Sequence, residues 1–181
     1  MDLLTFINNG MQNPILDLVV PIIYKITDAH VLPIIILVLL VAAWLLKKEK
    51  LKKILLLCFV SIIITFGIVL VLKMYHVSPR PYSVLSNIRL VVPDNGLNSF
   101  PSGHMSISMS IITVLLMKIK EYKLPLTILS ILYLLILAFS LLYAGVHYPL
   151  DIIVGVTVGG LISVFTVFVS NKLFYNYFNP E

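Results

Sequence analysis

The sequence predicts an all-α membrane protein, a polytopic helix bundle with about six transmembrane helices in a single domain over residues 1–181. Sixty per cent of the residues are hydrophobic and only 12% are charged, whereas about 25% are charged in an average soluble domain. The apolar residues form long runs, and a helix needs about 20 such residues to cross the hydrocarbon core. Because lipid offers no hydrogen bonds to an open backbone, these runs are expected to be helical.

Six apolar segments follow one another along the chain. The first is the weakest, because it is short and contains Asp17 and Pro21. The second and third have no internal charge. The longest polar connection, residues 76–99, contains three prolines and is expected to lie outside the helices. The segments run from Pro14 to Ile26, Val31 to Leu46, Ile54 to Lys73, Pro101 to Ile119, Leu124 to Tyr143 and Pro149 to Ser170.

Lysines are concentrated in the connections on one side of six crossings. By the positive-inside rule this side is the cytoplasm, so both termini are expected to be cytoplasmic and residues 76–99 to lie outside the plasma membrane. The net charge of +5 is then explained by the lysines that orient the protein in the membrane, and nucleic acid binding is not expected. The basic residues on the cytoplasmic side are Lys47, Lys48, Lys50, Lys52, Lys53, Lys118, Lys120, Lys123 and Lys172.

Three polar clusters fall at the outer ends of the third to sixth segments, where they can meet at one site. They extend from Lys73 to Pro81, from Pro101 to His104 and from Ser140 to Asp151. Each has a structural explanation when taken alone: a lysine at a helix end can snorkel to the headgroups, and an aspartate at a helix start is favoured by the dipole. Ionisable groups near membrane depth are costly, so their combination indicates a functional site.

Phosphate chemistry explains why these residue types occur together. Pro101 suits the first turn of a helix, so Ser102 and Gly103 would present N–H groups at its positive end, which is an anion site. Lys73 and Arg80 can neutralise phosphoryl oxygens, the arginine as a planar fork. The cluster therefore predicts a phosphate-binding pocket.

Two histidines, His104 and His147, can complete a hydrolytic reaction. One neutral imidazole can attack phosphorus, and a second, protonated imidazole can donate to the leaving oxygen. Asp151 follows His147 by four residues, and a carboxylate there can orient the ring and stabilise its positive charge. No clustered set of His, Asp and Glu ligands is evident, so no metal is expected.

The three clusters together resemble the motifs of the type 2 phosphatidic acid phosphatase superfamily, which includes lipid phosphate phosphatases, bacterial undecaprenyl diphosphate phosphatases and vanadium haloperoxidases. The first motif is lysine, six residues, then Arg-Pro; the second is Pro-Ser-Gly-His; the third is Ser-Arg, five residues, histidine, three residues, aspartate. Leu141 stands in the place of the third motif's arginine. The matching residues are Lys73, Arg80, Pro81, Pro101, Ser102, Gly103, His104, Ser140, His147 and Asp151.

This resemblance implies a membrane enzyme that hydrolyses a lipid phosphomonoester or diphosphate, with polyprenyl diphosphate favoured, without metal or cofactor. His147 would form a phosphohistidine, Asp151 would orient it, and His104 would protonate the leaving group. The active site would face the extracytoplasmic side of the membrane. The residues that would bind phosphate are Lys73, Arg80, Ser102, Gly103 and Ser140.

Leu141 leaves two other hypotheses open. Arg89, or His76 in the same connection, could supply the missing positive charge. Alternatively, the protein binds or transports lipid phosphates without turnover, because loss of a guanidinium removes transition-state stabilisation. A complete pair of histidines argues against that second hypothesis, since binding alone needs neither nucleophile nor acid. A metal-dependent membrane hydrolase is a third hypothesis, which activity in excess chelator would exclude.

Overall fold

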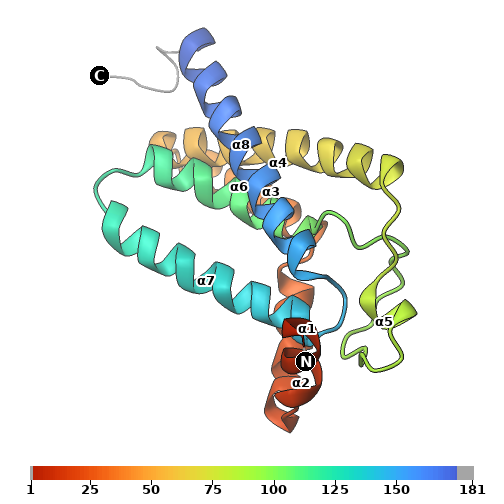
Figure 1. Cartoon of the computed structure of the whole chain (residues 1–181). Coiled ribbons are helices and arrows are strands. Elements are labelled where there is room, and N and C mark those ends of the chain that lie inside the picture. The colour runs from red at the N-terminus through yellow and green to blue at the C-terminus, as the bar shows by residue number, and fades with distance from the viewer. Residues whose placement is uncertain (1, 175–181) are drawn as a thin grey trace.

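The protein is described here by a computed structural model of residues 2–174, which form helices and no strands (Figure 1). The all-α prediction is confirmed. The six predicted segments correspond to the six long helices within a few residues, and three short helical elements are added to them. The elements are α1 (Leu3–Thr5), the π-helical turn η1 (Phe6–Gly10), α2 (Pro14–Ile26), α3 (Val31–Leu45), α4 (Glu49–Tyr75), α5 (Pro81–Val84), α6 (Gly103–Lys118), α7 (Lys123–Tyr143) and α8 (Pro149–Leu173).

Three of the helices, α4, α7 and α8, are each long and apolar enough to cross a bilayer. Helices α2 and α3 meet the same criterion only as a pair, and the pair is bent by 57° at its short connection. Helix α6 is apolar but has only 16 residues. The fold is therefore that of a polytopic helical membrane protein, but α2 and α3 differ from two separate full-length spans.

The N-terminal residues lie at the end of the bundle that carries residues 76–99. The side-chain amide of Asn8 donates to the carbonyl oxygens of Arg89, at 3.0 Å, and Tyr143, at 2.7 Å. The end of α8 lies at the other end, where Lys118 Nζ donates to Asn171 Oδ1 at 2.6 Å. Figure 1 likewise shows α1 far from the last turns of α8. Among the described residues, α1 and the last turn of α8 thus lie at opposite ends of the bundle, whereas six full crossings would bring them to the same end.

Small and polar side chains hold α4, α6 and α8 together. Ser61, Ser110 and Ser163 hydrogen-bond to one another across the three helices at 2.7–3.0 Å. A Cβ at Gly159 of α8 would collide with the carbonyl oxygen of Ser106 in α6, so this glycine permits close backbone approach. Such interfaces are typical of helices in lipid, where large apolar side chains gain nothing by turning inward. The large side chains are exposed instead, among them Leu132, Leu135, Leu161, Phe165 and Phe168.

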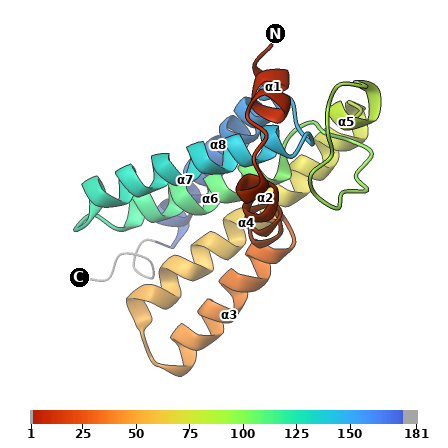
Figure 2. The ribbon, with the colours of Figure 1, turned by 90° about the horizontal axis from the view of Figure 1, so that it is seen from below.

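Helix α2 runs crosswise to α4 and α6, as the two perpendicular views show (Figures 1 and 2). It begins with Asn13 as N-cap, whose side chain accepts from the Ile15 N–H, and with a proline in the first turn. Asp17 Oδ1 accepts a hydrogen bond from the Tyr143 hydroxyl at 2.6 Å, which fixes α2 to the end of α7. The following turns of α2 consequently reach the region where the polar clusters meet.

Candidate active site

A cavity of about 290 Å³ lies where the site end of α4, the start of α6, the α7–α8 connection and the α2–α3 connection meet. The predicted clusters around Lys73, His104 and His147 all contribute to its wall. Residues from α2 and from the α2–α3 connection contribute as well, which the sequence did not predict. Of the predicted site residues, Lys73, Arg80, Gly103, His104 and His147 line the cavity.

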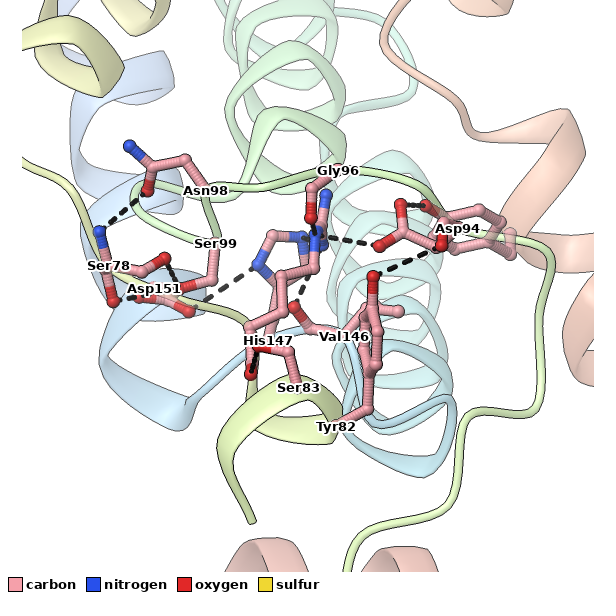
Figure 3. Close-up of polar contacts among 12 residues, drawn as sticks. Ser78, Tyr82, Ser83, Asp94, Gly96, Asn98, Ser99, Val146, His147 and Asp151 are labelled. Atoms are coloured by element: carbon pink, nitrogen blue, oxygen red, sulfur yellow. Dashed lines mark hydrogen bonds and ion pairs between the residues drawn. The ribbon is translucent and has the colours of Figure 1, made fainter. Parts of the chain in front are cut away.

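His147 lies in the connection between α7 and α8 (Figure 3), where it is buried and lines the cavity. Its Nδ1 is 3.6 Å from Asp151 Oδ2, and its Nε2 is 3.5 Å from Arg80 Nη1. A guanidinium nitrogen can only donate, so Nε2 must carry the lone pair and the proton resides on Nδ1, facing the carboxylate. Burial, reinforced by the nearby positive charges of Arg80 and Lys73, lowers the pKa of His147 to about 4 despite the opposing effect of Asp151. The ring is thus a neutral base whose free nitrogen lies beside a cation.

Asp151 is held rigidly at the start of α8. Its Oδ2 accepts from the Tyr148 N–H at 2.8 Å, so the carboxylate closes the first turn of the helix while facing His147. The carbonyl oxygen of Asp151 in turn accepts from the Ser102 N–H at 3.1 Å, which joins α8 to the start of α6. The second and third motifs are therefore connected through the backbone as well as through the cavity.

Arg80 is buried and fixed on several sides. Its Nε donates to the Gly96 carbonyl at 3.0 Å, its Nη1 donates to the Val146 carbonyl at 2.9 Å, and Asp94 Oδ2 lies 2.8 Å from Nε (Figure 3). A Cβ at Gly96 would lie only 2.5 Å from the guanidinium, so a larger residue there would displace Arg80 from this position. Such a pre-oriented fork suits recognition of phosphate oxygens.

Lys73 is positioned by Asn98, a residue that the sequence analysis did not single out. The lysine Nζ donates to the Asn98 carbonyl at 2.9 Å. The Asn98 side-chain amide donates to the carbonyls of Lys73 and His76, each at 2.7 Å, and so satisfies the open end of α4. Residues 76–99 are thus attached to the helix that carries the lysine.

The start of α6 supplies His104 and two predicted phosphate ligands. Ser102 is the N-cap, and its hydroxyl accepts weakly from the Met105 N–H at 3.4 Å. The ring centroids of His104 and His147 are 6.3 Å apart, so the two histidines share one pocket. His104 Nε2 lies 3.1 Å from the Tyr24 carbonyl oxygen of α2. Gly103 lines the cavity, whereas Ser102 stabilises the helix start beneath it.

Ser140 and Arg89 do not reach the cavity. Ser140 is buried in α7 and donates to the Ile136 carbonyl of its own helix at 2.8 Å. Arg89 binds Asp17 at 3.3–3.4 Å and the Asn8 carbonyl at 3.2 Å, which connects the N-terminal residues to the polar connection. In this structure Arg89 therefore lies outside the cavity wall, and its guanidinium pairs with Asp17 of α2.

Leu141 and His76 also lie away from the side chains that are predicted to bind phosphate. Leu141 is fully buried in an apolar cluster that includes Leu4 and Tyr143. His76 is exposed and packs edge-on against Phe100 at 4.8 Å. Neither residue is part of the cavity wall. Position 141 is thus part of the hydrophobic core here, and no charge at 76 stands in for the missing arginine.

Sequence reasoning missed the residues that orient the predicted ones. Asp94 pairs with Arg80, and its Oδ1 accepts from the Tyr24 hydroxyl at 2.9 Å. Asp28 and His30 join the cavity wall from the α2–α3 connection. The only local signal was the turn-like Asp-Asn-Gly beginning at Asp94, which predicts a bend and not a partner. Among residues 2–174, no group of three or more His, Cys, Asp or Glu side chains could hold a metal ion.

Fold and site together define a polytopic membrane protein with a pocket at one end of its helices that is lined by Lys73, Arg80 and two histidines. Residues 53–175 match the PAP2 superfamily, and the chain belongs to this family. The fold is similar to the crystal structure of Aquifex aeolicus LpxE, with a TM-score of 0.68 and 29% sequence identity over 91% of this chain and 92% of that one.

Two curated relatives are similar in sequence. An undecaprenyl-diphosphatase of Sulfolobus acidocaldarius is 33% identical over 113 residues, which cover 60% of this chain and 53% of the relative. The bacitracin transport permease protein BcrC of Bacillus licheniformis is 25% identical over 134 residues, which cover 74% of this chain and 64% of that protein. The chain thus matches between half and two thirds of the length of these relatives.

Proposed function

We propose that the protein is a membrane phosphatase that hydrolyses a phosphomonoester or diphosphate of a lipid through a phosphohistidine, without metal or cofactor. One observation carries the proposal: the free Nε2 of His147 lies beside the Arg80 guanidinium while Nδ1 faces Asp151. A phosphoryl group bound by Arg80 is thereby brought next to the nucleophile. Membership of the PAP2 superfamily supports the same chemistry.

The reaction would proceed in two displacements. With the phosphoryl oxygens bound by Lys73, Arg80 and the N–H groups at the start of α6, Nε2 of His147 attacks phosphorus and the ester or anhydride P–O bond breaks. His104 donates its proton to the leaving oxygen. His104 then accepts a proton from water, which attacks the phosphohistidine, breaks the P–N bond and releases phosphate. Asp151 stabilises the positive His147 ring in both steps.

Polyprenyl diphosphate is the substrate we favour. An apolar groove of about 570 Å³ between α2, the start of α3 and Pro93 shares Tyr24 and Asp28 with the phosphate pocket. A lipid chain whose phosphate occupies the pocket can lie in this groove against side chains such as Ile22 and Val31. The relative named undecaprenyl-diphosphatase supports a substrate of this class. Phosphatidylglycerophosphate, phosphatidic acid and lipid A are the alternatives.

The lysine-rich end of the bundle would lie in the cytoplasm of a plasma-membrane protein, with the pocket on the extracytoplasmic side. Lys47 and Lys48 follow α3, and Lys120 follows α6, at the end opposite to the cavity. A pocket on the outer face would meet lipid headgroups of the outer leaflet. The lipid bilayer and the lipid phosphate are thus the partners proposed for this chain.

A phosphate-release assay in detergent tests the proposal. Polyprenyl diphosphate, phosphatidic acid, phosphatidylglycerophosphate and lipid A would be compared, with His147→Ala as the negative control and excess chelator in a parallel series. We expect that excess chelator does not reduce phosphate release and that His147→Ala abolishes it. A protein that binds these lipids but releases no phosphate would instead support the binding or transport function, for which Leu141 and the transport name of one relative are the motivation. Loss of release in chelator would indicate a metal-dependent hydrolase.

A further inference from the structure

His104 is held by residues that lie outside the part of the chain matched to the family. The family match begins at residue 53, whereas the contacts to His104 come from the end of α2 and the α2–α3 connection. The His104 ring lies against the Tyr24 ring at 4.5 Å, and its Nε2 is 3.1 Å from the Tyr24 carbonyl oxygen. Asp28 Oδ2 lies 3.9 Å from the same nitrogen.

These contacts determine which nitrogen of His104 can transfer a proton. A backbone carbonyl can only accept, so Nε2 must carry hydrogen in both the neutral and the charged ring. Nδ1 has no hydrogen-bond partner in the part of the chain that the structure describes, so it is the nitrogen left for substrate. In the charged ring Nδ1–H donates, and in the neutral ring Nδ1 accepts from water.

The two oxygens of the Asp28 carboxyl have different partners. Oδ1 accepts from the His30 N–H at 2.8 Å, and the Asp28 carbonyl accepts from the N–H groups of Val31 and Leu32 at 3.0 Å, so one half of the residue closes the start of α3. Oδ2 is the oxygen that lies near His104. Closing a helix start requires an oxygen acceptor but no charge, and asparagine does it as well as aspartate. The hydrogen bonds of this cap therefore do not require the negative charge of Asp28, although the dipole of α3 also favours a charge there.

The other carboxylates around the pocket are already paired. Asp151 faces His147, and Asp94 pairs with Arg80 at 2.8 Å. The remaining charged or titratable groups that face His104 are Lys73 and Arg80, which bear positive charge, together with His147, His30 and Tyr24. Among residues 2–174, Asp28 is thus the carboxylate left to balance a positive charge on His104.

We propose that Asp28 is a positioning residue for His104: together with the Tyr24 carbonyl it orients the ring through Nε2–H and stabilises the imidazolium, so that Nδ1–H protonates the leaving oxygen. This inference rests on the proposed function, in which His104 is the acid. The inference gives residues of the bent α2–α3 pair a role in catalysis, although none of the three sequence motifs includes these residues. In the transfer, the Nδ1–H bond breaks as the leaving-group O–H bond forms, and the positive charge near Asp28 is lost until water is deprotonated.

Substrates with different leaving groups distinguish a loss of acid catalysis by His104 from a general loss of activity. The alkyl oxygen of a lipid phosphomonoester needs a proton to leave, whereas p-nitrophenolate leaves without one. Asp28→Asn keeps the α3 cap and removes the charge, so we expect about a tenfold or larger fall in kcat with a lipid phosphate and little change with p-nitrophenyl phosphate. The alkaline limb of the kcat/KM profile for the lipid should move to lower pH. Thr27→Ser, in the same connection, is the matched control and should change neither.

A double-mutant cycle with His104→Ala completes the test. If Asp28 acts through His104, Asp28→Asn should have no further effect once His104 is alanine. Equal losses for both leaving groups, an unmoved pH profile or additive effects would overturn the assignment of Asp28. If His104→Ala itself fails to distinguish the two leaving groups, the acid role in the proposed function is wrong and the inference falls with it. Unfolding of each variant in detergent is measured first, and an unfolded Asp28→Asn protein would show that its charge serves the fold, contrary to the proposal.

Discussion

Arg80 Nη1 lies 3.5 Å from His147 Nε2, so in the proposed reaction one side chain would both bind the phosphoryl group and orient the lone pair that attacks it. The arginine cannot accept a hydrogen bond, and this determines the tautomer of the histidine. Asp94 and the carbonyls of Gly96 and Val146 keep the guanidinium in that place.

Removing the nucleophile should end turnover. His147→Ala is expected to lower kcat by about a thousandfold or more, as loss of a nucleophile does elsewhere, and to prevent trapping of a phosphoenzyme. The control is Ser140→Ala, because Ser140 bonds within α7 and should be dispensable for chemistry. Phosphate release and radiolabelled phosphate on acid-quenched protein are the measurements. Near-normal release by His147→Ala would contradict the assignment.

Acid should affect activity and folding in different pH ranges. The pKa of His147 is lowered to about 4 by burial, so its free nitrogen remains available well below the ordinary value of 6.5. We expect the His147 contribution to the acid limb of kcat/KM to appear near pH 4. Because the unfolded chain takes up this proton first, the stability tied to His147 is complete above about pH 6.5 and is lost as the pH falls toward 4.

The same titration can be followed in thermal unfolding. His147→Asn has no titrating ring, so its melting temperature should fall less than that of the natural protein between pH 6.5 and 4. Parallel slopes for the two proteins would show that His147 is not the group responsible. An acid limb centred near 6.5 in the natural protein would contradict the lowered pKa.

Asp94 should matter for binding more than for chemistry. Asp94→Asn removes the charge that orients Arg80, and we expect KM to rise about tenfold or more, the scale of one charged hydrogen bond. Tyr82→Phe removes only the hydroxyl that donates to the Asp94 carbonyl at 3.2 Å and is the milder control. Steady-state kinetics with a soluble phosphate ester provide KM and kcat. A fall in kcat at constant KM would indicate a direct role in the reaction.

An arginine at position 141 should not restore the family motif here. Leu141 is fully buried among apolar side chains, so Leu141→Arg would leave a buried charge without a partner and cost about 3 to 5 kcal/mol of stability. We expect a lower melting temperature in detergent and no gain in phosphate release. Leu141→Met preserves volume and apolarity and should be nearly neutral. Higher turnover in a folded Leu141→Arg protein would show that the backbone can turn this position toward the pocket.

Single cysteines can locate the N-terminal residues. Gln12→Cys and Asn95→Cys should react with a membrane-impermeant reagent from the same side, and Lys120→Cys from the other, because residues 3–13 pack against the end that carries residues 76–99. The native Cys58 is buried and gives little background. Labelling of Gln12→Cys together with Lys120→Cys would restore the prediction of two full crossings by α2 and α3.

The sequence by itself determined the helices and the three motifs. The helices could be located because the signals for them are local in the sequence. The lengths of the apolar runs, the prolines and the positions of the lysines placed all six long helices within a few residues. The close sequence spacing within each motif likewise brought His147 and Asp151 together on one turn. Only the tertiary structure decided what surrounds them. Tyr24 and Asp28, at the 57° bend between α2 and α3, lie against His104, about eighty residues away in the sequence, and Asp17 pairs with the similarly distant Arg89. No local pattern encodes such contacts, because they depend on how whole helices pack.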